Sequence, residues 1–393
     1  MSRAVALFSG GRGASSIAKG FLRTPGVGLS LLINGYDNGR STGALRRYLP
    51  GMLGPSDFRK NLLLHLDRRD PRQAALHAVL EHRLPPGTTR HDLRELVGSL
   101  ADPAAPGPFA ALPCRARAAI VRELTALLGH LDGRPGLDLA DCALGNLVFA
   151  GAYLRRGGDF NAAVQACART FGSPAAILNV TNGENAYLVA VKENGRVLAD
   201  EADIVAPQDP AAITDLFLVR ETLTPERRRE LEALPAARRR QALARAAAAV
   251  TLNPRASEAL LHADLIVYGP GTPHSSLYPS YLTPGVADAI AASRAAAKVF
   301  VANIGDDHDV QGLRPDDLLR RTLRYLGDPD NRRRSVTHVL CHAAAPPPEP
   351  GVAGVRWVVA DLEDPEHPGR HHGARTVRAL NRIADEALPA RAG

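Results

Sequence analysis

The sequence is poor in several residue types, and each scarcity narrows what the protein can be. Its 393 residues include four cysteines with no C-x-x-C spacing, so a disulfide framework and a cysteine zinc site are both disfavoured. No apolar run approaches the roughly 20 residues that span a bilayer. Aromatic residues make up 5% of the chain and do not accompany the arginine clusters, which argues against a nucleic-acid surface. We therefore expect a cytoplasmic globular protein with reduced thiols and neither a nucleic-acid nor a membrane partner.

Lysine is also scarce. Four of the 48 basic residues are lysines, so the other 44 are arginines, and the formal net charge is +7. The arginine clusters at 227–229, 238–240 and 332–334 are better explained by solvated helix faces than by a polyanion. A basic balance does suit a small anionic ligand. The N-terminus passes directly into a strand pattern, so we expect no signal peptide.

Strand patterns alternate with helix patterns along the chain. Short apolar runs occur at 3–9, 29–33, 175–180, 264–268, 298–302, 336–340 and 355–360. This alternation predicts an α/β fold, with a parallel sheet covered by helices on both faces. We expect one domain over 1–393, with a helical insertion at 62–140 and an Arg/Ala-rich helical arm at 207–250. Asn194-Gly195 predicts a β-hairpin, because both residues tolerate positive φ.

The first candidate site follows the first strand. Gly10, Gly11 and Gly13 precede a helix that runs to about Arg23. A strand, a glycine loop and a helix N-terminus leave backbone N–H groups free to bind an anion. The loop matches neither G-x-G-x-x-G nor the P-loop with its lysine, so a nicotinamide dehydrogenase is disfavoured and a tight turn without a ligand fits equally well.

The densest polar stretch runs from Leu31 to Asn61. A strand gives way to a polar loop at 34–43, and a second polar cluster at 54–61 opens a helix for which Ser56 or Asp57 is the expected N-cap. Carboxylate, amide, hydroxyl and guanidinium groups all occur within this passage. An ordinary surface loop is the alternative to a site.

A second glycine-rich loop, at 269–276, follows the strand at 264–268 and is a second candidate anion site. An ordinary βα turn is the alternative. Asp306, Asp307 and Asp309 form either a divalent-ion site or an exposed acidic loop. The acidic residues at 200–204 are expected to close a strand at a solvated end, with a catalytic role as the alternative. His367, His371 and His372 have no matching ligand set, so zinc is not expected.

Two of these passages resemble one known family. Residues 37–46, followed by 54–62, resemble the Asp-Asp-Gly-Gly-Ser-Ser-Gly-x-Leu-Arg … Pro-Gly-Asp-x-Arg-x-x-Leu signature of the 2-phospho-L-lactate transferase / gluconeogenesis factor superfamily. The loop at 269–276 resembles that family's Gly-Pro-Gly-Ser-x-x-x-Ser element. The resemblance covers most of the chain, and the order of the motifs is the same.

The resemblance implies a Rossmann-like core, a homodimer and a nucleotide-linked ligand. One branch of the family transfers a 2-phospholactate-type group from a guanosine diphosphate donor to a deazaflavin, with Mg²⁺, in coenzyme F420 biosynthesis. The other binds a UDP-sugar and regulates carbon metabolism and cell-wall synthesis. We expect transfer of such a phosphoester to an acceptor hydroxyl, with a non-catalytic UDP-sugar-binding regulator as the alternative.

The family's site residues carry over by motif. The implied catalytic residues are Asp37, Asp57 and Arg59, and Asp37 is also the implied metal ligand. The implied substrate-binding residues are Gly10, Gly11, Gly13, Asn38, Arg40, Ser41, Asn61, Asn146, Gly269, Gly271, Thr272, Ser275, Ser276 and Asn303. We expect the separate loops to converge on a pyrophosphate.

The sequence departs from the family at two positions. Asn38 replaces the second carboxylate of an Asp-Asp pair, which should weaken Mg²⁺ binding because hard cations prefer carboxylate oxygens. Arg40 replaces a glycine and is suited to bidentate binding of a phosphate.

Overall fold

The computed structural model describes residues 2–104, 106–206, 209–305, 313–343 and 352–388. It divides into two compact units. The sheet unit comprises Met1–Tyr36 and Leu178–Gly393, and the helical unit comprises Asp37–Ile177.

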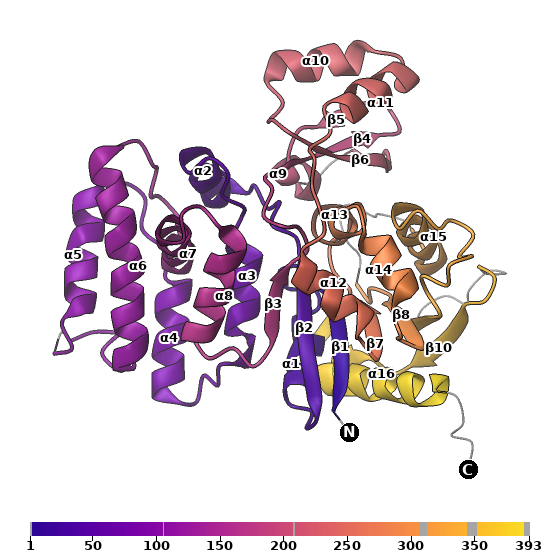
Figure 1. Ribbon diagram of the computed structural model, residues 1–393, viewed down its shortest axis with the longest axis horizontal. Helices are drawn as coiled ribbons and strands as arrows, with labels where there is room; N and C mark the ends of the chain where they lie inside the picture. The colour runs from indigo at the N-terminus through magenta and orange to yellow at the C-terminus, as the bar shows by residue number, and fades with distance from the viewer. Residues whose placement is uncertain (1, 105, 207–208, 306–312, 344–351, 389–393) are drawn as a thin grey trace. The chain divides into compact units, whose positions relative to one another are not determined.

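A seven-stranded sheet, in the order β10-β9-β8-β7-β1-β2-β3, forms the core of the sheet unit (Figure 1). Its strands are β1 (Arg3–Phe8), β2 (Val27–Ile33), β3 (Ala176–Asn179), β7 (Leu265–Tyr268), β8 (Ala297–Val301), β9 (His338–His342) and β10 (Arg356–Ala360). The neighbouring pairs from β10 to β2 run parallel, with Val5 opposite both Leu29 and Leu265. The predicted parallel α/β fold is confirmed.

Helices cover both faces of this sheet. On one face α1 (Ser15–Leu22) packs against α16 (Gly373–Ala387), and on the other face α12 (Pro254–Leu261) packs against α14 (Val286–Ala292). The β1-to-β2 and β7-to-β8 connections proceed in opposite directions across the sheet, so right-handed crossovers place α1 and α14 on opposite faces. Strands β7 and β8 are buried along their whole length, which explains their continuous apolar sequences.

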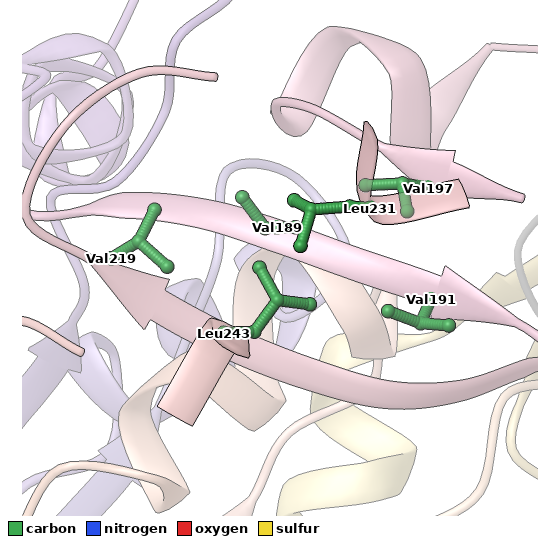
Figure 2. Close-up of a cluster of buried hydrophobic side chains, with 6 residues drawn as sticks. All are labelled: Val189, Val191, Val197, Val219, Leu231 and Leu243. Atoms are coloured by element: carbon green, nitrogen blue, oxygen red, sulfur yellow. The ribbon is translucent and has the colours of Figure 1, made fainter. Parts of the chain in front are cut away.

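A smaller antiparallel sheet, in the order β5-β4-β6, also belongs to the sheet unit. It contains β4 (Tyr187–Lys192), β5 (Val197–Leu198) and β6 (Ile213–Val219). Gly195 has φ of +89° at the predicted hairpin turn between β4 and β5. Helices α10 (Pro225–Ala233) and α11 (Ala236–Arg245) complete its core, where Figure 2 shows six apolar side chains together. The segment 207–250, which we expected to be a helical arm, thus contains the strand β6 as well as these two helices.

The remaining elements of the sheet unit lie in the connections between the strands of its two sheets and near its C-terminal end. These are α9 (Glu201–Val205), the π-helix η2 (Pro273–Leu277), α13 (Tyr278–Tyr281), α15 (Pro315–Tyr325), and the hairpin of β11 (Glu363–Asp364) and β12 (His367–His371). The prediction that residues 200–204 close a strand was wrong. They form α9, because the Asp200 side chain accepts a hydrogen bond from the Asp203 backbone N–H at 3.0 Å and caps the helix.

The helical unit contains α2 (Arg40–Tyr48), α3 (Ser56–Leu62), η1 (Leu63–His65), α4 (Pro71–Glu81), α5 (Arg90–Ala101), α6 (Cys114–Gly133), α7 (Leu144–Arg155) and α8 (Phe160–Thr170). Helices α6 and α7 cross so closely that a Cβ at Gly151 would lie 1.9 Å from the Glu123 carbonyl oxygen. Glycine at this position is therefore what permits the crossing.

The described helices and the cysteines agree with what the composition suggested. None of the described helices combines the length and the apolar character that crossing a bilayer requires. The four cysteines are free thiols, and three of them are buried.

Candidate functional site

A cavity of about 550 Å³ opens at the carboxyl ends of β1, β7 and β8. We call it the sheet-edge cavity. The strand order reverses between β1 and β7, and ligands of open α/β sheets bind at such a switch point. The cavity is lined by Gly10, Gly11, Arg12, Gly13, Ser15, Ser16, Lys19, Pro270, Gly271, Thr272, Ser276, Asn303, Ile304, Gly305, Asp364, His367, Gly369, Arg370 and His371.

The two predicted glycine loops touch each other in this cavity. A Cβ at Gly13 would lie 2.4 Å from Gly271 Cα and 2.4 Å from the Pro270 carbonyl oxygen. A Cβ at Gly10 would lie 2.5 Å from Ser276 Cβ. Gly271 itself has φ of +149°, which side chains disfavour. The glycines therefore bring two stretches of backbone into direct contact, although Gly13 and Gly271 are 258 positions apart in the sequence.

Two asparagines, the half-buried Asn303 and the buried Asn34, hold the second loop in place. The Asn303 amide donates to the Gly271 carbonyl at 3.1 Å and accepts from the Gly271 N–H at 3.1 Å. Asn34 donates to the Ser276 carbonyl at 2.6 Å. The predicted loop at 269–276 is shorter than expected, because η2 begins at Pro273 and takes Ser275 and Ser276 into a helical turn. Gly269 lies at its start, where a Cβ would meet the Phe8 carbonyl oxygen at 2.6 Å.

The electrostatics of the cavity favour an anion. Arg12, Lys19 and Arg370 line it and have no ion-pair partner among the described residues. Of the described residues in its wall, Asp364 is the single acidic one. Helix α1 begins at its edge with no side-chain cap and no acidic residue in its first turn. Its free N–H groups and the positive end of its dipole attract negative charge.

His371 is a buried wall residue, with 4% of its surface exposed. Its Nε2 lies 3.0 Å from the Ala302 carbonyl oxygen, which can only accept, so Nε2–H is the donor. Burial lowers the pKa of His371 to about 4, and the nearby His342 adds to the effect against the opposing hydrogen bond to Ala302. The ring is therefore neutral at pH 7.

We expect His371 to make the protein less stable as the pH falls. Between pH 6.5 and the folded-state pKa of about 4, the unfolded chain binds a proton that the folded chain does not. The contribution of His371 to the free energy of unfolding is therefore complete above the unfolded-state pKa and is lost as the pH falls. Between pH 7 and pH 4 this one group lowers the free energy of unfolding by roughly 3 kcal/mol. Urea unfolding of the wild type and His371→Phe at both pH values measures it. Equal pH dependence in the two proteins would refute the prediction.

A second and more open hollow lies on the small antiparallel sheet. Its arginines include Arg196 and Arg228, which pair with Asp209 at 3.0 Å and Asp203 at 3.1 Å. Because neighbouring acids already satisfy these charges, this hollow attracts an anion less strongly than the sheet-edge cavity does.

The helical unit contains the polar residues of the second predicted passage. Asp57 lies in the first turn of α3, and its Oδ1 accepts a 2.8 Å hydrogen bond from Lys60 Nζ. Burial raises the pKa of Asp57, the Lys60 charge opposes that effect, and the Asp37 carboxylate reinforces it. Asn61 donates to the Asp57 carbonyl at 2.8 Å, so its amide group is engaged within its own helix.

The prediction that Ser56 or Asp57 caps α3 was wrong. Pro55 occupies the cap position, and the helix begins at Ser56. The Ser56 hydroxyl instead shares a 2.6 Å hydrogen bond with Thr42 Oγ1 and accepts from Asn146 Nδ2 at 3.1 Å. Competition from these buried partners explains why the serine does not cap the helix. Asn146 Oδ1 has no hydrogen-bond partner among the described residues.

Arg59 is almost fully buried, at 2% exposure. Its Nε lies 3.2 Å from Glu81 Oε1, and burial lowers its pKa while Glu81 opposes that shift. A Cβ at Gly145 would lie 2.6 Å from Arg59 Cδ. The Gly145-Asn146 pair therefore has a structural role, in which the glycine leaves room for the arginine and the asparagine bonds Ser56.

The loop before α2 holds Asp37 and Asn38. Asp37 Oδ1 accepts from the Gly39 N–H at 2.9 Å, and the Asn38 Oδ1 has no partner among the described residues. The predicted loop at 34–43 ends earlier than expected, because α2 begins at Arg40 and includes Ser41. The side chain of Arg40 lies outside what the structure describes.

These residues fit a resident Mg²⁺ poorly. Within the described part of the chain, no group of three or more His, Cys, Asp or Glu side chains could hold a metal ion. Lys60 already engages the Asp57 carboxylate, and Asn38 supplies an amide where a second carboxylate would help. Asp306, Asp307 and Asp309 lie outside the described residues. A metal at Asp37 stays a prediction.

The sequence-based site is thus found in two parts. Gly11 and Thr272 line one cavity, whereas Asp57, Arg59 and Asn146 belong to the helical unit. Their convergence with the sheet-edge cavity stays a prediction.

Several residues of these two sites were not predicted, and they are Arg12, Lys19, Lys60, Arg370 and His371. Arg12 and Lys19 could have been found from their place in the first loop and helix. No local signal marked Arg370 or His371, because their hairpin has neither an apolar alternation nor a recognised motif.

Comparisons with known proteins agree with the fold. A sequence model of the family described as "2-phospho-L-lactate transferase CofD" matches residues 5–371. A putative gluconeogenesis factor of Thermotoga maritima is 24% identical over 346 residues, which are 88% of this chain and 80% of that protein. The gluconeogenesis factor of Halalkalibacterium halodurans is 25% identical over 324 residues, or 82% of this chain and 74% of that protein.

A solved structure shows the same fold. The crystal structure of a UPF0052-family protein from Bacillus halodurans covers 96% of this chain and 99% of its own, with a TM-score of 0.65 and 22% identity. Because the family model matches nearly the whole chain, this protein belongs to the 2-phospho-L-lactate transferase CofD family.

Proposed function

We propose that this protein binds a nucleoside-diphosphate-linked ligand and holds the diphosphate in the sheet-edge cavity. The proposal rests mainly on one observation: two glycine loops meet at the switch point of the sheet, beside three cationic side chains that have no ion-pair partner among the described residues. A diphosphate needs many hydrogen-bond donors and positive charge at close range. The loop N–H groups, the α1 N-terminus, Arg12, Lys19 and Arg370 supply both.

The size of the cavity suits such a ligand. Its volume of about 550 Å³ falls within the range of roughly 300–1,000 Å³ that is usual for small-molecule sites. The close contact of Gly13 with Gly271 leaves the backbone accessible where side chains would otherwise cover it. Backbone N–H groups can then approach the phosphate oxygens directly.

Of the two candidate functions, we propose first that the protein is a regulator that binds a UDP-sugar without turning it over. The Asp57–Lys60 pair and the amide at Asn38 leave little carboxylate charge for a metal-dependent transfer. The name "gluconeogenesis factor", carried by the relatives, supports the same choice.

A 2-phospholactate-type transferase is the second candidate. Burial raises the pKa of Asp57, and a general base toward an acceptor hydroxyl works best when its pKa lies closer to the working pH. The family model's description supports this candidate. Dimer formation and a cytoplasmic location, which we expected from the sequence, stay predictions.

Thermal unfolding with nucleotides tests the proposal. We expect UDP and UDP-glucose to stabilise the protein in EDTA, by about 2.7 kcal/mol at a concentration of 100 times Kd. Arg370→Met should reduce this stabilisation, because it removes one positive charge from the cavity wall. Arg378→Met makes the same change on an exposed part of α16 outside the cavity and should leave it intact.

The outcomes separate the two candidates. A response confined to GDP with Mg²⁺ would favour the transferase, whereas a metal-independent response to UDP-sugars favours the regulator. If neither UDP, UDP-glucose nor GDP stabilises the protein with or without Mg²⁺, the proposed function is wrong.

A further inference from the structure

His371, which lines the sheet-edge cavity, carries a hydrogen-bond acceptor that none of the described residues uses. His371 Nδ1 is buried and has no hydrogen-bond partner among the described residues. The other ring nitrogen donates to the Ala302 carbonyl, and this bond fixes the orientation of the ring. Buried polar atoms are nearly always bonded, so an unused one in a cavity wall points to a partner that arrives with the ligand.

The chemistry of this nitrogen is restricted. Since Nε2 carries the proton that the Ala302 carbonyl accepts, Nδ1 of the neutral ring has only a lone pair. Ionised phosphate oxygens also present only lone pairs, so Nδ1 and a phosphate oxygen repel each other. The partner of Nδ1 must therefore be an O–H or N–H group.

The position of His371 relates this acceptor to the phosphate site. Ala302, to which His371 donates, directly precedes Asn303 at the end of β8. Asn303 in turn makes two hydrogen bonds to Gly271 in the second glycine loop. One short chain of contacts thus joins the His371 ring to the loop that is proposed to hold the diphosphate. In a nucleoside diphosphate, the O–H groups nearest to the phosphates are those of the ribose.

We propose that His371 is a specificity-determining residue, whose Nδ1 accepts a hydrogen bond from a ribose hydroxyl of the bound nucleoside diphosphate. This inference rests on the proposed function and adds to it the part of the ligand that is recognised. Sites that hydrogen-bond a ligand hydroxyl reject analogues that lack it, because the buried acceptor is then left unpaired. The cavity should therefore distinguish ribonucleotides from one deoxy form.

Calorimetric titration of the 393-residue chain tests the inference. The probes are UDP and GDP, each compared with its 2′-deoxy and 3′-deoxy form. We expect the wild type to bind the ribonucleotide on the order of tenfold more tightly than one of the two deoxy forms. The other deoxy form should bind like the parent, since one acceptor contacts one hydroxyl.

Three variants separate recognition from structure. His371→Phe keeps a ring and loses both nitrogens, so it should bind the ribonucleotide about tenfold more weakly and lose the discrimination. His371→Asn places an amide oxygen near the position of Nδ1 and should restore the discrimination, which a purely structural role would not do. His91→Phe makes the same aromatic change on an exposed part of α5 and should bind like the wild type.

The results distinguish this inference from the function on which it rests. If the wild type binds UDP or GDP equally with and without each hydroxyl, the role of His371 is refuted and the proposed function survives. The same holds if His371→Phe retains full discrimination. If the wild type binds no nucleoside diphosphate, the function and the inference are both wrong.

Discussion

Gly13→Ala is expected to abolish nucleotide binding and to destabilise the sheet unit by about 3 kcal/mol, the upper end for overpacking. The new Cβ would lie 2.4 Å from both Gly271 Cα and the Pro270 carbonyl oxygen. These are backbone atoms, so no side-chain rotation relieves the clash. One glycine loop must move away from the other, and the N–H groups that both loops present to the ligand then no longer converge.

Urea unfolding and nucleotide titration of Gly13→Ala measure the two effects. Gly28→Ala is the matched control, because a Cβ on that β2 residue meets nothing within 4 Å. The control should keep its nucleotide affinity and change stability by less than about 1 kcal/mol. Wild-type affinity in Gly13→Ala would show that the contact between the loops does not build the site.

Gly151→Ala is expected to destabilise the helical unit by several kcal/mol, on the order of 3 kcal/mol or more. Its Cβ would lie 1.9 Å from the Glu123 carbonyl oxygen and 2.5 Å from the Glu123 carbonyl carbon. Helix α7 would have to move away from α6 along the whole contact. Alanine's better helix propensity returns at most about 1 kcal/mol, so the clash decides the sign.

The control for this change lies on the partner helix. Gly129 is exposed on α6, and a Cβ there meets nothing within 4 Å. Gly129→Ala should therefore stabilise the protein by up to about 1 kcal/mol, as expected for an unhindered helix position. Both variants are compared by urea unfolding. Stabilisation by Gly151→Ala would contradict the close crossing of α6 and α7.

The prediction of the elements succeeded where the signal was local. Strands β7 and β8 appear in the sequence as continuous apolar runs, because both faces of a central parallel strand are covered. The hairpin at Gly195 was predicted from a dipeptide that tolerates positive φ. The hairpin of β11 and β12 was missed, because its sequence is polar and its position depends on contacts with the rest of the sheet unit.

In the candidate site, too, the roles that depend on distant residues could not be predicted from the sequence. Ser56 had the residue type of a helix cap, but Thr42 and Asn146 bind its hydroxyl, and neither residue is near it in sequence. His371 was dismissed as a zinc ligand on its sequence neighbours alone. Its importance comes from the Ala302 carbonyl, 69 residues earlier in the chain.

By itself, the sequence determined the α/β alternation, the two glycine loops and the family to which the chain belongs. Each of these can be recognised from residues that are close together in the sequence. Only the tertiary structure decided which loops meet. The order β8-β7-β1-β2 places the ends of β1 and β7 side by side, although more than 250 residues separate them, and hydrogen bonding between strands carries no local signature of partner choice. The hydrogen bond to Ala302, just after β8, holds the His371 ring at the cavity, and its other ring nitrogen has no partner in the described chain.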